Sequence, residues 1–285
     1  MKKETWAIYY EAINKVVDYI NINLYNNRLT TKHLASMVCL SEYHFHRIFK
    51  SIIGESVGTY IIRLRLENIA QRLYTGSQSL TEIASQTTYQ SKYALSKEFK
   101  KHFGVNPSSF RSNKQYFKLQ FNYTGELCPI ITHIADKTVV YIRIIGIYGE
   151  ESAYHKAWQK LYCFAKVNNL LNNKTEPLGI SFDDPSISDK HSRFYACVTV
   201  NKNIEPHGEF GLKTIIGGLY AIFTLKGSYS GLNDLYSAIY YKWMPDSGYK
   251  FRKGIFYEKY LNNPDKVNEN DILTEVYIPI QLNNI

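Results

Sequence analysis

Two stretches of the sequence carry the same polar side chains at the same helical spacing. Each opens with Ser, has Tyr two residues later and Arg or Lys six residues later, and closes with Gly: 41–54 (SEYHFHRIFKSIIG) and 91–104 (SKYALSKEFKKHFG). Arg and Lys pair with phosphate groups, while Tyr, His and Ser form hydrogen bonds with base edges. One arc of each predicted helix would therefore suit contact with nucleic acid. This arc holds Tyr43, His46, Arg47 and Lys50 in the first copy and Lys92, Tyr93, Ser96, Lys97 and Lys100 in the second.

The apolar side chains of both stretches fall on the opposite arc, at the spacing of a stripe that packs against a core. The expected inward residues are Phe45, Ile48, Phe49, Ile52 and Ile53 in the first copy and Leu95, Phe99, His102 and Phe103 in the second. Gly54 and Gly104 close the copies, and glycine commonly ends a helix in the left-handed conformation. The sequence therefore predicts two helices, each with one buried and one polar face.

A further similarity lies upstream of each copy. The segments 30–40 (TTKHLASMVCL) and 79–90 (SLTEIASQTTYQ) begin with the good N-caps Thr30 and Ser79, and Ser79 with Glu82 makes a capping-box pattern. Each unit is thus predicted to be a short helix, a turn and a second helix, which is a helix-turn-helix.

The stretch between the units, 59–74 (TYIIRLRLENIAQRLY), has apolar residues at helical spacing and predicts one long helix. Such a helix can hold the two units at a fixed separation. Two recognition helices on one rigid body can enter successive major grooves, about 34 Å apart. The duplication would let a monomer bind DNA in the way that a dimer normally does.

Residues 8–112 resemble the AraC/XylS DNA-binding domain, through LASMVCLSEYHFHRIFKSIIGESVGTYIIRLRLENIAQRL and SLTEIASQTTYQSKYALSKEFKKHFGVNPSSFR. The resemblance implies that the polar faces of the two second helices contact bases, through Tyr43, His46 and Arg47 in the first and Lys92, Tyr93, Ser96 and Lys97 in the second. It also implies a regulator of transcription, expected to be an activator whose partners are double-stranded DNA and RNA polymerase.

The charge distribution agrees with a polyanionic partner for the first part of the chain. Residues 1–115 hold 16 Lys and Arg against 8 Asp and Glu, whereas residues 116–285 hold 18 against 17. Excess positive charge confined to one region favours nucleic acid as its partner, with a merely solubilising surface as the alternative. The four cysteines form no CxxC pair, so we expect no metal and no cofactor. Without a long apolar run or a signal sequence, a cytoplasmic protein with no membrane partner is expected.

From residue 129 the pattern changes to strands. The stretches 137–146 (KTVVYIRIIG) and 218–227 (GLYAIFTLKG) are rich in β-branched and aromatic residues, and each is followed by a predicted helix and two further strands. A strand-helix-strand-strand unit that occurs twice predicts an α+β domain with pseudo-twofold symmetry. The predicted protein is therefore multidomain: an all-α domain with two helix-turn-helix units over 1–114, a linker over 115–126 and an α+β domain over 127–285.

The second domain resembles the GyrI-like ligand-binding domain, through IRIIGIYG, GISFDDP, IIGGLYAIFTLKGSY, KWMPDSGY, IFYEKYLNNP and TEVYIPI. The combined order is similar to that of Rob-type transcription activators. The resemblance implies a cleft for a small, often cationic or aromatic effector, with Glu258 as the charged contact. Aromatic rings around a carboxylate suit an organic cation, because charge pairing and cation–π attraction then act together. The candidate ligand-binding residues are Tyr148, Phe182, Trp243, Tyr257 and Glu258.

Several alternatives remain open at this point. The aromatic residues could be core filler, and Glu258 could pair with Lys259 or Arg252. The second domain could also be a small-molecule hydrolase that uses Glu258 to activate water, or a protein-interaction module. No Ser-His-Asp or Cys-His set is legible, so a regulator without enzymatic activity is the prediction.

Overall fold

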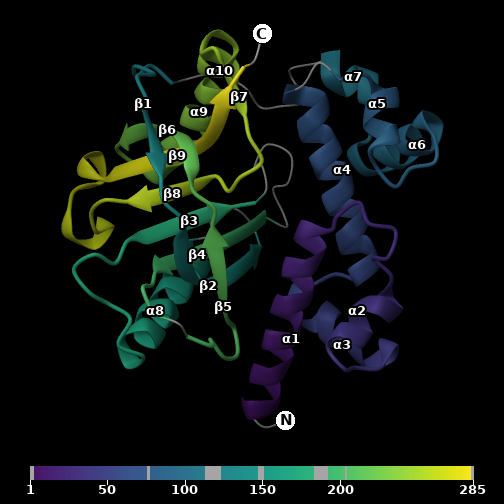
Figure 1. Ribbon diagram of the computed structural model, residues 1–285, viewed down its shortest axis with the longest axis horizontal. Helices are drawn as coiled ribbons and strands as arrows, with labels where there is room; N and C mark the ends of the chain where they lie inside the picture. Colours follow the sequence, from purple (N-terminus) through teal and green to yellow (C-terminus); the bar gives the residue numbers. More distant parts are fainter. Residues whose placement is uncertain are drawn as a thin grey trace. The chain divides into compact units, whose positions relative to one another are not determined.

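The computed structural model describes residues 3–75, 78–112, 123–146, 151–182, 192–202 and 204–283. The chain divides into two units, formed chiefly by residues 1–118 and by residues 119–285 (Figure 1). The predicted linker 115–126 lies outside the described residues except for 123–126.

The first unit consists of helices in its described part. They are α1 (Lys3–Ile22), α2 (Thr31–Met37), α3 (Glu42–Ile53), α4 (Val57–Thr75), α5 (Leu80–Ser85), α6 (Lys92–Phe103) and α7 (Pro107–Ser112). The pairs α2–α3 and α5–α6 are the two predicted helix-turn-helix units, and α4 is the long helix between them. Figure 1 shows the two pairs toward opposite ends of α4.

Local hydrogen bonds start the short helices where the sequence predicts. The Thr30 side chain accepts a hydrogen bond from the backbone N–H of His33, and the capping box between Ser79 and Glu82 is confirmed. The buried face of α4 holds Tyr60, Leu64, Leu66, Ile69, Ala70 and Leu73, so α4 forms the core against which both pairs pack.

The second unit is built on an antiparallel sheet. Its strands are β1 (Ile130–Ile134), β2 (Lys137–Gly146), β3 (Pro177–Ser181), β4 (Ser192–Thr199), β5 (Phe210–Ile215), β6 (Gly218–Lys226), β7 (Tyr249–Phe251), β8 (Tyr257–Tyr260) and β9 (Leu273–Leu282). The order in the sheet is β1-β6-β9-β8-β3-β4-β2-β5, and β7 pairs with the end of β9.

The two faces of this sheet have different partners. The helices α8 (Glu151–Val167) and α9 (Leu232–Ala238) pack against the same face of the sheet. Ala196 packs under α8 and Val276 under α9, and the cross-strand pairs Ala196–Gly179, Gly179–Glu258 and Glu258–Val276 place both on one face. We call this the helix face. The opposite face carries a layer of buried tyrosines, namely Tyr141, Tyr195, Tyr220, Tyr257 and Tyr277.

Most predicted elements of the second unit are confirmed, including β2 and β6, which match the predicted strands 137–146 and 218–227. The short strands β1, β5 and β7 were not predicted. Both β1 and β5 lie at the sheet edges, where exposed Ile130 and Leu212 break the pattern of a half-buried strand. The helix predicted after the strand 218–227 is α-helical only over α9 and then widens into the π-helical turn η3 (Ile239–Trp243).

Candidate nucleic-acid interface and ligand site

Helix α3 presents its predicted polar arc to solvent. The Ser41 side chain caps the helix by accepting from the N–H of His44, and Gly54 ends it at φ 90°. Phe45 and Phe49 are fully buried on the inner side. The predicted contact residues Tyr43, His46, Arg47 and Lys50 are all exposed.

Helix α6 repeats this arrangement. Ser91 caps its start and Gly104 ends it at φ 76°. Lys92, Tyr93, Lys97 and Lys100 are exposed and Ser96 is half-buried, whereas Leu95 and Phe99 are buried on the inner side. His102 was expected to be inward but is exposed, because it lies one residue before the end of the helix, where less structure covers it.

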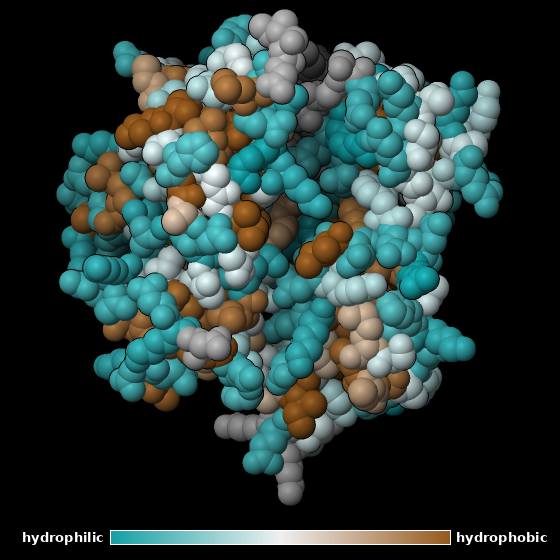
Figure 2. Space-filling view, viewed as in Figure 1, coloured by the Kyte–Doolittle hydropathy of each residue, from teal (hydrophilic) through white to brown (hydrophobic). Residues whose placement is uncertain are grey.

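The two arcs share a cation beside an aromatic ring. The guanidinium carbon of Arg47 lies 5.7 Å from the centroid of the Tyr43 ring, and the Lys92 ammonium lies 5.3 Å from that of Tyr93. Such a pair presents a positive charge and a flat apolar surface together, which suits a phosphate and its neighbouring sugar or base. Hydrophilic surface predominates around α5 and α6, at the upper right of Figure 2.

Glu258 occupies a buried position on the helix face of the second unit. It is paired across the strands with Gly179 on one side and Val276 on the other, at the junction of β3 and β8. Its side chain is 1% exposed. The hydroxyl of Tyr260 donates to Oε2 at 2.7 Å, and the hydroxyl of Tyr236 in α9 donates to Oε1 at 3.3 Å. Burial raises the pKa of Glu258 to about 7, although the two hydroxyl groups act in the opposite direction.

Aromatic rings surround this carboxylate. The Tyr260 ring meets Tyr229 at 5.5 Å and Trp158 of α8 at 5.7 Å, both edge to face. Burial, and then the nearby Glu258 carboxylate, raise the pKa of the Tyr229 hydroxyl to about 12. Gly179 makes room for Tyr260, because a Cβ at Gly179 would lie 2.2 Å from the Tyr260 hydroxyl.

A further polar group lies beside Tyr260. Thr274 is its cross-strand partner and is 0% exposed. Its Oγ1 has no hydrogen-bond partner among the described residues. Buried hydroxyls normally have a partner, so Thr274 is a group that a bound molecule could satisfy.

The remaining predicted ligand residues do not join Glu258. Tyr257 faces the opposite side of β8, since neighbouring residues of a strand alternate, and it stacks on Tyr277 at 4.4 Å. Phe182 also packs on the tyrosine layer, at 4.6 Å from Tyr195. Trp243 lies on the helix face but contacts Phe223, two strands away from Glu258. Tyr148 lies outside the described residues.

The structure pairs Lys259 and Arg252, the two basic residues that could have formed an ion pair with Glu258, with other groups. The Lys259 ammonium lies 2.8 Å from Glu176, and Arg252 donates to the backbone oxygen of Gly217. The residues that do surround Glu258 are Trp158, Tyr229, Tyr236, Tyr260 and Thr274, none of which was predicted. Strand alternation could have found Tyr260, two residues from Glu258, but no local pattern indicates the others.

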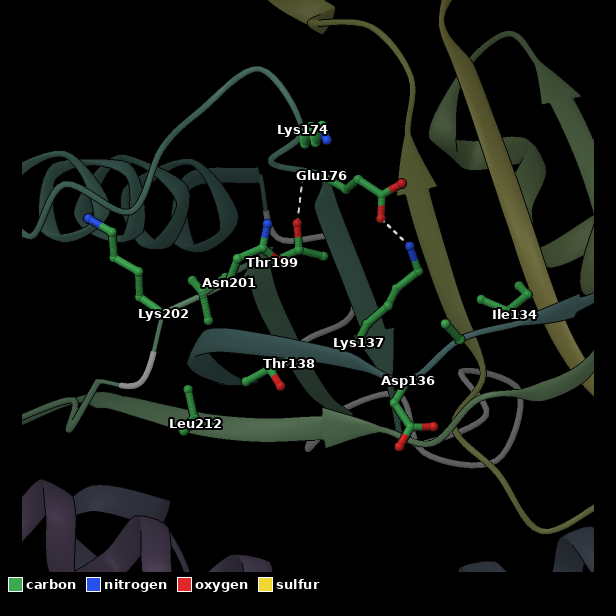
Figure 3. A pocket seen from close by; sticks show the side chains of 12 residues that line it. Ile134, Asp136, Lys137, Thr138, Lys174, Glu176, Thr199, Asn201, Lys202 and Leu212 are labelled. Atoms are coloured by element: carbon green, nitrogen blue, oxygen red, sulfur yellow. Dashed lines mark hydrogen bonds and ion pairs between the residues drawn. The ribbon is translucent and has the colours of Figure 1, made fainter.

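A separate pocket of about 660 Å³ opens near the start of β2 (Figure 3). Lys137 points toward Glu176 and forms an ion pair with it, whereas Lys202 donates to the backbone oxygen of Asn169 at 3.0 Å. Burial acts against ionisation of Glu176, but the hydrogen bonds and charges of Lys137 and Lys259 lower its pKa below the ordinary value. None of the predicted ligand residues lines this pocket.

Comparisons with known proteins identify both units. Residues 34–113 match a helix-turn-helix domain of the AraC type, and residues 129–281 match the GyrI-like small molecule binding domain. The transcriptional regulator Rob of Salmonella typhimurium is 23% identical over 250 residues, which cover 83% of this chain and 86% of Rob.

Two other relatives match a shorter part of the chain. The transcriptional activator AarP of Providencia stuartii is 31% identical over 99 residues, covering 35% of this chain and 73% of AarP. The uncharacterized transcriptional regulator YbfP of Bacillus subtilis is 31% identical over 111 residues, covering 39% of this chain and 37% of YbfP. This chain therefore spans little more than a third of the length of YbfP.

An AraC-type helix-turn-helix domain followed by a small-molecule-binding domain defines a DNA-binding regulator of transcription. The chain belongs to the GyrI-like small-molecule-binding family. In its described part, no helix has the length and apolar character needed to cross a membrane.

Proposed function

We propose that this chain is a transcription activator that binds two successive major-groove segments as a monomer and responds to a small organic cation. The observation that carries the DNA-binding part is the pair of equivalent exposed arcs on α3 and α6. Helix α4 joins their units and, with 19 residues, is about 28 Å long. This length is comparable to the repeat of the major groove along one side of the duplex, about 34 Å.

The activator role has its support in AarP, which is named an activator and is 31% identical over 99 residues. An activator acts by recruiting or reorganising RNA polymerase, which is therefore the proposed protein partner. The proposed domain limits are 1–114 and 127–285, joined by 115–126. The proposed duplication in the second domain has its support in the sheet order, where β5-β2-β4-β3 is followed by β8-β9-β6-β1.

The proposed effector site is the Glu258 cluster, defined as Glu258, Tyr229, Tyr236, Tyr260, Trp158 and Thr274. A carboxylate whose burial raises its pKa to about 7 gains most from a partner that carries a positive charge. Tyr and Trp rings on two sides add cation–π attraction, so an aromatic or lipophilic cation is the proposed ligand class.

We propose that Glu258 does not act in catalysis. Its two oxygens already accept hydrogen bonds from Tyr260 and Tyr236, which leaves little room to orient a water molecule toward a substrate. The two alternative functions of the second domain, a hydrolase and a protein-interaction module, do not require Glu258 to bind a cation. The dye-binding experiment below therefore separates them from the proposed effector site.

Selection of duplexes from a random library with the purified chain tests the DNA-binding part. The proposal predicts a bipartite site whose halves are about one helical turn apart. For the effector, titration with a fluorescent cationic dye at pH 8 should show saturable binding that Glu258→Gln weakens by at least about tenfold. Glu275→Gln is the matched control, because Glu275 is bonded to Tyr277 on the opposite face of the sheet. Equal dye affinity in all three proteins would remove the effector site.

A further inference from the structure

A buried ion cluster lies where the first helix-turn-helix unit meets α4. Arg63 of α4 is 6% exposed and lies between two carboxylates. Its Nε donates to Glu55 Oε1 at 2.9 Å and its Nη2 to the same oxygen at 2.5 Å. Its Nη1 donates to both oxygens of Glu67 at 3.2 Å. We call Glu55, Arg63 and Glu67 the Arg63 cluster.

The position of this cluster connects it with both recognition helices. Glu55 directly follows Gly54, the residue that ends α3. The Arg63 guanidinium also lies 5.4 Å from the ring of Tyr60, which packs at 5.5 Å against Phe49 of α3. The cluster therefore joins the end of α3 to α4 both by charge and through a ring.

The end of α6 approaches the same charges. His102 lies in the last turn of α6. Although His102 is exposed as a whole, partial desolvation and then the charge of Arg63 lower its pKa, and the charge of Glu55 raises it in part. The charges of the Arg63 cluster thus also act on the last turn of α6.

Apolar packing alone lets one helix shift slightly against another. The guanidinium of Arg63 has its donors in a fixed plane, so each hydrogen bond fixes the direction in which the carboxylate partner must lie. Burying three charged groups does not itself require a gain in stability, because well-packed apolar residues of similar volume often do as well. A role in fixing geometry accounts for a cluster at this junction.

We infer that the Arg63 cluster is a positioning element, which fixes α3 against α4 and thereby sets the spacing between the two DNA segments that the protein accepts. This inference rests on the proposed two-segment reading of DNA. Inserting one base pair between the segments shifts the second by about 3.4 Å and rotates it by about 35°. A rigid pair of recognition helices cannot follow that change, but a loosened pair can.

The experiment uses the duplex that the wild-type protein selects from a random library, a version with one base pair inserted between its halves, and versions with either half scrambled. The variant Glu55→Gln/Arg63→Met/Glu67→Gln removes all three charges of the cluster together, so that none of the three remains without the other two. The control Lys226→Met/Asp271→Asn removes an exposed ion pair of the second unit.

We expect the insertion to weaken wild-type and control binding by at least about tenfold, and binding of the triple variant by about threefold or less. Affinity for each half-scrambled duplex should be the same in all three proteins. A triple variant with the full insertion penalty would overturn the inference. So would equal losses on every duplex, which would show that the cluster only supports folding.

If the triple variant does not fold, Arg63→Lys replaces it, since it keeps the charge but loses the paired donors. An intermediate insertion penalty with unchanged half-site affinity would support the inference, and an unchanged penalty would overturn it. A wild-type protein that binds a bipartite site but tolerates the insertion contradicts the positioning role alone. A wild-type protein that selects no bipartite site contradicts the proposed function itself.

Discussion

The recognition helices and the Glu258 cluster combine the same two ingredients, a charged group and aromatic rings, in opposite ways. On α3 the cation Arg47 is exposed beside Tyr43, and on α6 the cation Lys92 is exposed beside Tyr93. In the second unit the anion Glu258 is 1% exposed and receives hydrogen bonds from tyrosine hydroxyls. Exposed cations retain their hydration and bind a polyanion by releasing its counterions, whereas a buried carboxylate carries a penalty that one matching cation can relieve.

The two regions should differ most in how strongly ligand affinity depends on salt concentration. Affinity for the cognate duplex should fall by about 10³- to 10⁵-fold between 50 and 200 mM salt if about 6–10 phosphates are contacted. Dye binding at the Glu258 cluster should change little over the same range, because buried charges are weakly screened. Titrations of both ligands across a salt series measure this, and a flat DNA response would contradict the assignment of the two arcs.

The next effect concerns stability. The pKa of Glu258 is raised from 4.5 to about 7, so its contribution to folding stability falls as pH rises through that interval. Glu258→Gln removes the ionisable group and should stabilise the second unit by about 3 kcal/mol at pH 8, with little difference near pH 4.5. Urea unfolding of the full chain at pH 4.5 and pH 8 measures this difference. A variant less stable than wild type at pH 8 would show that burial does not penalise the ionised carboxylate.

The reading arc gives a smaller effect. Arg47→Ala should cost about 1–3 kcal/mol on the cognate duplex and relax the preference at one base position. Competition with a scrambled duplex measures it. Unchanged affinity on both duplexes would remove Arg47 from the interface.

The smallest effect comes from the helix that carries the second arc. Ser91→Ala removes the cap of α6 and should lower the free energy of unfolding of the first unit by about 1 kcal/mol. The control is Ser228→Ala, which removes the N-cap of the short 3-10 helix η2 (Tyr229–Gly231) in the second unit and should leave the unfolding of the first unit unchanged. Equal unfolding midpoints for the two variants would argue against the role of the cap.

Local chemistry explains how much of this architecture the sequence predicts. Helix caps, closing glycines and apolar stripes depend on residues close together in the chain, so the sequence alone predicts α3, α6 and their polar arcs. The Glu258 cluster depends on β8 lying beside β3 and on α9, packed on β6 and β9, bringing Tyr236 to Glu258, and these are long-range pairings. Tyr257 and Glu258 are neighbours in the chain, yet strand alternation places their side chains on opposite faces of the sheet. The Arg63 cluster was missed for the same reason as Tyr236, since its charges meet only after α3 has packed on α4.

In the proposed complex, α3 and α6 bind different segments of one duplex. The most direct measurement is the affinity of wild-type protein, Arg47→Ala and Lys97→Ala for a set of duplexes in which each base pair of the selected site is substituted in turn. We expect each variant to lose its preference at a different segment, with the two segments about 10 base pairs apart. Loss of preference at the same positions in both variants, or at none, would contradict it.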